Sequence, residues 1–151
     1  MQNTNADLIK AIHKMTSEEE HLNERMERLR FKRAYLLYKI DSENKWKSMG
    51  YRSFSDFADA AFPNTNYATL RAMAGAGKFL RMTESGEVYS IVAEKKVVNN
   101  ISGEERIVDY DLSILEQMRK LTLDRFKSLH EQGVINFEMK QKEIKELMKN
   151  Y

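Results

Sequence analysis

The chain has 151 residues, with 25 Lys or Arg against 23 Asp or Glu, and it contains no cysteine. This length fits one domain with or without an appendage, and the missing cysteine excludes disulfides and thiolate metal sites. No stretch approaches about 18 uncharged apolar residues, and the first residues lack the apolar core of a signal peptide, so we expect a cytoplasmic protein without a membrane span.

The charge is unevenly distributed, although the net charge is only +2. Residues 1–24 carry two basic and five acidic side chains, whereas residues 25–52 carry nine basic and three acidic ones. Clustered Lys and Arg attract the phosphates of nucleic acids, but a solvated helix face is the more common reason for such a run. The basic block therefore indicates a nucleic-acid partner only in combination with the segments that follow it in the sequence.

Residues 17–48 are predicted to form one long helix, after a short helical turn over residues 7–14. Ser17 and Glu20 fit a capping box, and no Pro or Gly follows before Gly50. Spacings of four and three define a heptad stripe, interrupted by one arginine: Leu22, Met26, Leu29, Arg33, Leu36 and Ile40. Because the first half carries only this narrow stripe, we expect a projecting arm that pairs with a second copy or with a partner helix.

Two short helices joined by a polar corner are predicted next. Ser53 is a cap for a helix to about Phe62, and Asn66 or Thr65 caps another from about Tyr67. Pro63, the only proline, ends the first helix, and asparagine tolerates turn conformations. With Ala58, Leu70 and Met73 filling the crossing, this pattern describes a helix-turn-helix unit.

The remaining segments complete a mainly α fold with one small β-hairpin. Runs rich in Val and Ile predict strands at 95–101 and 106–110 around a turn at 102–105. Helices are expected from Asp111 or Ser113, from Thr122 to Gly133, and over 139–151. The predicted organisation is an N-terminal segment (1–48), a helix-turn-helix with its hairpin (49–110) and a C-terminal helical segment (111–151).

The residues predicted to contact DNA fall into three groups. The corner and the outward face of its second helix offer side chains that bond base edges or phosphates: Asn64, Thr65, Asn66, Tyr67, Thr69, Arg71 and Lys78. The basic block offers phosphate contacts from Arg28, Arg30 and Lys32, while Arg33 belongs either to this group or to a dimer seam. The hairpin, where a winged helix-turn-helix protein has its wing, offers Lys95, Lys96 and Arg106.

The stretch KWKSMGYRSFSDFADAAF, with the turn and capped helix after it, resembles helix-turn-helix proteins of bacterial phages and plasmids. The later DYDLSILEQMRKL, EQGVI and MKQKEIKELMK resemble the helical segment that often follows in those proteins, so the resemblance covers about residues 40–150. It departs at the turn, where Pro63 and Asn64 replace the usual glycine and aliphatic residue. The resemblance implies a DNA-binding regulator, or a partition or replication accessory.

Other chemistries are not indicated by the sequence. AGAGKFL lacks the first glycine and the final Ser or Thr of a phosphate-binding loop. The three histidines, His13, His21 and His130, are widely spaced, and no acid–base pair stands out, so we expect no enzyme, no cofactor and no metal.

The predicted function is sequence-specific binding of double-stranded DNA by a homodimer, because one helix-turn-helix unit contacts few base pairs. The alternative is a phage-encoded interaction module that inhibits a host protein. In that case the long helix is the binding surface and the corner is purely structural.

Overall fold

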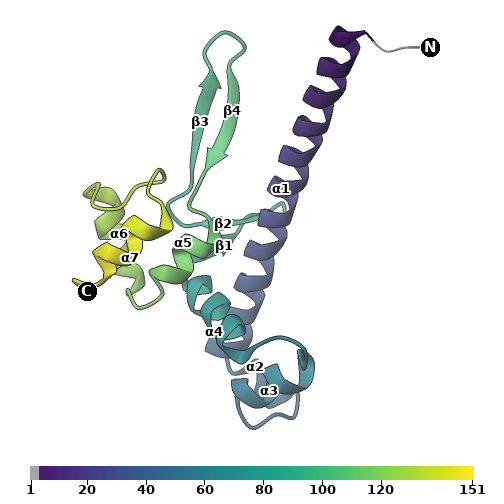
Figure 1. The fold of residues 1–151 in the computed structure, drawn as a ribbon. Helices are drawn as coiled ribbons and strands as arrows, with labels where there is room; N and C mark the ends of the chain where they lie inside the picture. Colours follow the sequence, from purple (N-terminus) through teal and green to yellow (C-terminus); the bar gives the residue numbers. More distant parts are fainter. Residues whose placement is uncertain (1–3) are drawn as a thin grey trace.

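The computed structural model describes residues 4–151. Within them the chain forms a mainly α fold with two small antiparallel hairpins, β1–β2 and β3–β4 (Figure 1). The elements are α1 (Asn5–Ser42), α2 (Lys45–Ser48), α3 (Phe54–Ala61), α4 (Tyr67–Ala76), the 3-10 helix η1 (Gly77–Phe79), β1 (Leu80–Met82), β2 (Val88–Ser90), β3 (Glu94–Asn99), β4 (Glu104–Val108), α5 (Leu112–Gln117), α6 (Leu123–Glu131) and α7 (Gln141–Met148). No helix in this part of the chain is long and apolar enough to cross a membrane.

Helix α1 begins earlier and ends earlier than predicted. A capping box starts it, in which the Thr4 side chain accepts from the Asp7 backbone and the Asp7 carboxylate accepts from the Thr4 backbone. The predicted start at Ser17 is wrong because this earlier cap satisfies the first N–H groups and no helix breaker follows. The helix stops at Ser42 rather than Ser48, since Asn44 adopts a left-handed conformation, with a φ of 52°, before α2.

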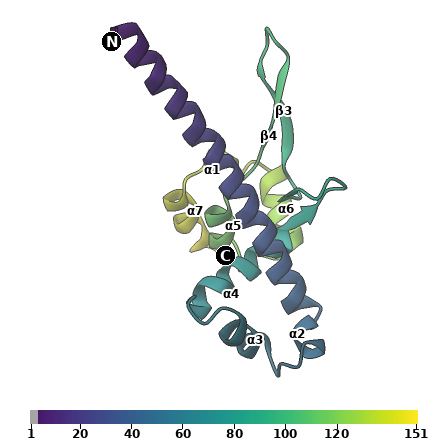
Figure 2. The ribbon, with the colours of Figure 1, turned by 90° about the vertical axis from the view of Figure 1, so that its right-hand side faces the viewer.

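The first part of α1 projects from the rest of the molecule. Every residue of the helix before Glu27 is exposed, and the buried face begins at Phe31. Figures 1 and 2 both show this part of α1 leaving the core without covering another element. The predicted arm is therefore present, and it spans about 33 Å at 1.5 Å per residue.

The second part of α1 belongs to both hydrophobic clusters of the protein. In the larger one, Phe31 and Ala34 pack with η1, β1, β2 and the C-terminal helices. In the smaller one, Leu37 packs with α3 and α4. Met73 of α4 touches both clusters, so α4 is held against α1 along its inner face.

A close approach between α1 and the end of α4 depends on Gly77. A Cβ atom at this position would lie 2.6 Å from the Ala34 carbonyl oxygen and would overlap the Tyr38 side chain. Only glycine permits this spacing, and it fixes where α4 lies along α1.

Hairpin β1–β2 is not predicted by the sequence, and hairpin β3–β4 turns earlier than predicted. In the latter, Lys96 pairs with Arg106 and Asn99 with Glu104, so the chain reverses before residue 104. The Asn99 side chain accepts from the Ile101 and Ser102 amides, and Gly103 has a φ of 72°, which places the turn two residues early. All of β3 is exposed, and the hairpin projects from the core (Figure 2).

Among the C-terminal helices, α5 packs on α1 and α4, α6 packs on η1 and α7 packs on α5. Asp111 rather than Ser113 precedes α5, and Thr122 caps α6. The Glu27 carboxylate of α1 accepts from the first backbone amide of α5, Leu112, at 2.7 Å. This bond ties the C-terminal segment to the point where α1 leaves the core.

Candidate nucleic-acid interface

The corner between α3 and α4 has the local structure that its sequence predicts. The Ser53 hydroxyl accepts from the Asp56 amide at 3.0 Å, and the Asn66 side chain accepts from the Ala68 amide at 2.7 Å. Ala58 of α3 and Leu70 of α4 are almost completely buried at the crossing. These two caps and this small-to-large contact set the angle at which α4 leaves the corner.

The N-terminal end of α4 is exposed and polar. The predicted contact residues here are all exposed: Asn64, Thr65, Asn66, Tyr67 and Thr69. Tyr67 also leans on Phe54 of α3, with the two ring centroids 6.4 Å apart. This end therefore combines a rigid backing with free hydrogen-bonding groups.

Arg71 lies on the same helix but is held toward α1. Its guanidinium forms an ion pair with the Asp41 carboxylate at 2.6 Å and lies 5.7 Å from the centre of the Phe54 ring. The Arg71 side chain is still about half exposed, at 54%. Because a guanidinium has five N–H donors, the pair with Asp41 leaves donors available to a ligand.

Lys78 does not lie near the corner. Its amine donates to the Arg119 carbonyl just beyond α5, and burial lowers the pKa of Lys78. About twelve residues of helix separate it from Asn66, roughly 18 Å at 1.5 Å per residue. Lys78 therefore does not share a surface with the N-terminal end of α4, as the predicted DNA contact requires.

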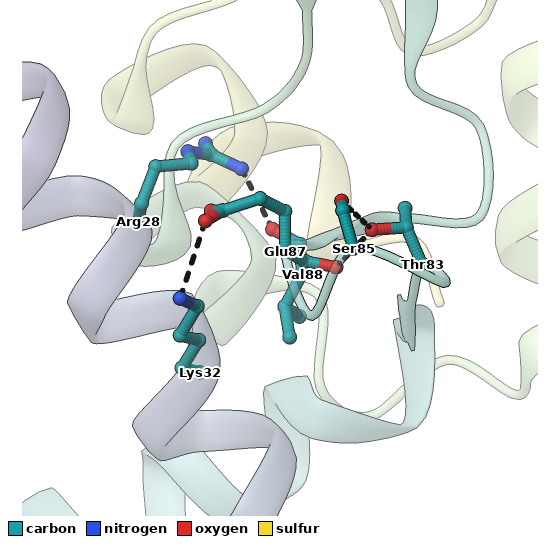
Figure 3. A network of polar contacts seen from close by, with 6 residues as sticks. All are labelled: Arg28, Lys32, Thr83, Ser85, Glu87 and Val88. Atoms are coloured by element: carbon teal, nitrogen blue, oxygen red, sulfur yellow. Dashed lines mark hydrogen bonds and ion pairs between the residues drawn. The ribbon is translucent and has the colours of Figure 1, made fainter.

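Two members of the basic block hold hairpin β1–β2 against α1. Arg28 donates to the Val88 carbonyl at 2.8 Å and its guanidinium lies 4.3 Å and 4.4 Å from the Phe31 and Tyr89 ring centres. Lys32 forms an ion pair with Glu87 at 3.2 Å, and both side chains reach from α1 toward the hairpin in Figure 3. In the same figure Thr83 and Ser85 close the hairpin turn with a hydroxyl–hydroxyl bond. This network accounts for Arg28 and Lys32 without a nucleic acid.

The remaining predicted contacts are spread over other parts of the molecule. Arg30 lies 3.7 Å from Glu27, Lys96 lies 3.8 Å from Glu94, and Arg106 lies 3.3 Å from Glu104. On hairpin β3–β4, Lys95 is exposed, and so are both residues of the Lys96–Glu94 and Arg106–Glu104 pairs. Figures 1 and 2 both place this hairpin and the α3–α4 corner toward opposite ends of the molecule. The structure thus does not bring the three predicted groups together.

A cleft of about 840 Å³ separates the arm of α1 from hairpin β3–β4. Its charged lining holds three arginines, Arg28, Arg30 and Arg106, and six carboxylates, Glu20, Glu24, Glu27, Glu104, Asp109 and Asp111. An excess of carboxylates repels phosphate groups. The cleft is therefore a poor path for a nucleic acid, although basic residues line part of it.

Three cations beside the corner were not singled out by the sequence. Lys45 and Lys47 on α2, and Arg52 before α3, are exposed at the same end of the molecule as α3. They are the last members of the basic block, beyond the end of α1. The signal that could have found them is their position just before Ser53, because the N-terminus of the first corner helix is a common place for phosphate contacts.

Comparison with family models, with curated proteins and with solved structures finds no match to this chain. Among residues 4–151, no group of three or more His, Asp or Glu side chains is arranged to hold a metal ion.

Proposed function

We propose that this protein binds double-stranded DNA through the α3–α4 corner. In this proposal the N-terminal end of α4 enters the major groove, and Lys45, Lys47 and Arg52 contact the phosphates beside it. The observation that carries the proposal is the exposed polar end of α4, whose opposite face is locked onto α1 by Leu70, Ala74 and the close approach at Gly77. A rigid helix end with free amide and hydroxyl groups matches the way recognition helices contact base edges.

The proposal is narrower than the sequence-based prediction. Arg28 and Lys32 are assigned to the hairpin contacts, and Lys95, Lys96 and Arg106 lie away from the corner. Residues 43–72 hold four basic and three acidic side chains, so the nonspecific attraction of one corner to phosphate is small. Useful affinity then requires two corners on one site, and we propose a homodimer that acts as a regulator or as a partition or replication accessory.

Selection of bound fragments from a random pool of duplex DNA tests this function directly. We expect a palindromic sequence to be enriched, because two identical corners read two half-sites. A pool that stays random after repeated rounds would reject sequence-specific binding.

On the enriched site, Arg71→Ala is expected to weaken binding by about 5- to 150-fold, which corresponds to about 1–3 kcal/mol. Arg106→Ala, at the opposite end of the molecule, is the matched control and is expected to leave the affinity unchanged. Asp41→Asn releases the Arg71 guanidinium without removing it, so this variant should bind at least as well as wild type. Equal affinities for wild type and Arg71→Ala, with both folded, would move the contact away from α4.

The second candidate is a module that binds a host protein. It is favoured by the exposed apolar stripe on α1, in which Leu22 and Leu29 are 58% and 64% exposed. Binding that is independent of DNA and insensitive to salt would support this candidate, since phosphate contacts weaken steeply as salt rises.

A further inference from the structure

The heptad stripe of α1 is longer than the predicted stripe of residues 22–40. With the helix starting at Asn5, the same spacing of four and three runs back through Glu19, Met15 and Ile12 to Leu8. All five d positions are then Leu or Met: Leu8, Met15, Leu22, Leu29 and Leu36. The a positions are Ile12, Glu19, Met26, Arg33 and Ile40. The stripe therefore extends over five heptads on one helix.

Except at Ile40, its last member, this stripe faces away from the protein's own core. Phe31 and Ala34 are completely buried on one side of α1, whereas Leu29 and Leu36, on the other side, are more than half exposed. Ile40, at the end of the stripe, is the member that packs against the smaller cluster beside Trp46. A second helix can therefore lie along the stripe without displacing the hydrophobic core that α1 forms with the rest of its own chain.

The projecting arm also lacks the contacts that usually stabilise a helix. Most helical stability in proteins comes from the packing of an apolar face rather than from the propensity of the helix alone. In the arm, Ile12 and Met15 are each about 60% exposed. A partner along the stripe would supply the missing packing.

We propose that two copies of this protein pair through α1 in an antiparallel coiled coil, with the acidic half of each helix on the basic half of the other. This inference deepens the homodimer of the proposed function, but its argument uses only α1. The charges select the occupant, because within α1 residues 5–24 carry an excess of three negative charges and residues 25–42 an excess of four positive ones. A second copy laid in reverse brings these opposite halves together.

The two charged a positions select the orientation. In a parallel pair in register, Glu19 faces Glu19 of the second copy and Arg33 faces its Arg33, so two layers of the seam hold like charges. In an antiparallel pair with Leu22 opposite Met26, Glu19 faces Leu29 and Arg33 faces Met15. Each charged residue then lies against an apolar one, and Glu19 lies about one turn from Arg33 of the second copy. The remaining layers pair Ile12 with Leu36 and Leu8 with Ile40.

Engineered disulfides can test the orientation, since the chain has no cysteine of its own. Met15→Cys and Arg33→Cys are made as separate proteins, both at exposed positions. Under oxidation, the antiparallel pair predicts a cross-link only when the two variants are mixed. In that pair, two copies of residue 15 are about 27 Å apart along the axis, from 18 residues at 1.5 Å each, which no disulfide spans. Cross-linking of either variant with itself, at the expense of the mixed product, would overturn the orientation.

Sedimentation of the full chain tests the pairing itself, without DNA. Wild type is expected to be a dimer, and Leu22→Glu with Leu29→Glu is expected to be a monomer that keeps its folded core. The matched control, Lys10→Glu with Ser17→Glu, adds negative charge on the opposite side of the same arm and should remain dimeric. A wild-type monomer at high concentration would overturn the inference. Sequence-specific DNA binding by that monomer would keep the α3–α4 corner as the DNA contact and would reject the homodimer of the proposed function.

Discussion

At the residue scale, Gly77 is the position where the smallest change should have the largest effect on stability. An added methyl group at Gly77 meets the Ala34 backbone and the root of the Tyr38 side chain, neither of which can move without shifting α1. We expect Gly77→Ala to lower the free energy of unfolding by about 1–3 kcal/mol, as overpacking of a core does. Chemical denaturation measures this change.

Gly75→Ala is the matched control, two residues earlier in α4. Its added Cβ would lie 3.2 Å from the Arg119 Cβ, so the neighbour has to shift by only a few tenths of an ångström, far less than the overlap at Gly77 requires. The gain in helix propensity, about 0.5–1 kcal/mol, should offset the crowding. Equal losses in both variants would contradict the close approach that fixes α4 on α1.

Arg28 is the residue for which the sequence-based role and the structural role make different predictions. Because its guanidinium bonds the Val88 carbonyl and packs on two aromatic rings, Arg28→Ala should lower the free energy of unfolding by about 1–3 kcal/mol. Arg25→Ala, at an exposed position one turn earlier, should change it by less than about 0.5 kcal/mol. If Arg28→Ala is as stable as wild type but its DNA binding depends less steeply on salt, the predicted phosphate contact of Arg28 would be supported instead.

At the scale of elements, Asp109 links β2 to the junction between β4 and α5. Its carboxylate accepts from the Ser90 amide at 2.7 Å, from the Ser90 hydroxyl and from the Tyr110 amide at 2.8 Å. Burial raises the pKa of Asp109 above its ordinary value of 3.8, although these hydrogen bonds and the nearby Arg28 oppose the shift. The folded state therefore holds this proton over a pH range in which the unfolded chain has released it.

The sign of the pH dependence follows from this linkage. The stability contributed by Asp109 is present below its unfolded pKa and is lost as the pH rises through its raised folded pKa. Above about pH 4, near the ordinary pKa of Asp109, the unfolding free energy of wild type relative to Asp109→Asn should fall as the pH rises through the raised folded pKa. Urea titrations at several pH values measure the difference, with Asp111→Asn at an exposed site as the control for charge. A difference that grows with pH would mean that hydrogen bonding outweighs burial.

The elements that the sequence predicts well are those whose signals are local. Ser53, Asn66 and Thr122 cap helices at the predicted places because each cap bonds an amide two or three residues away. Hairpin β1–β2 is missed because three-residue strands are too short to show alternation. Its polar contacts with α1 come from Arg28 and Lys32, whose partners Val88 and Glu87 lie 60 and 55 residues further along the chain. No local pattern carries such a pairing.

The difference between local and long-range signals also explains which residues of the candidate site could be predicted from the sequence. The exposed end of α4 is set by the corner and its caps, so residues 64–69 could be chosen from the sequence. The positions of hairpin β3–β4 and of Lys78 depend on how α5 packs on α1 and α4, which the sequence pattern does not encode locally. The Arg71–Asp41 pair also joins residues 30 positions apart. Local sequence signals therefore indicate each of the three groups of predicted contact residues, but the folded chain places the groups on different parts of the molecule.

At the scale of the whole molecule, α1 connects regions that have different roles. One part packs with both hydrophobic clusters, and the other projects as an arm beside hairpin β3–β4. The α3–α4 corner lies at the other end (Figure 2). A DNA duplex at the corner and a second copy along the stripe would therefore occupy separate surfaces of one protein.

Because no Gly or Pro interrupts α1, its length acts as a fixed spacer in the proposed antiparallel pair. Tyr38, beside the end of α4, lies 14 residues from the centre of that pair, which separates its two copies by about 42 Å along the axis. One extra heptad in the arm would lengthen this separation by about 10 Å while keeping the same face toward the partner. The residue count of a single helix would then determine which spacing of DNA half-sites the two corners can reach together.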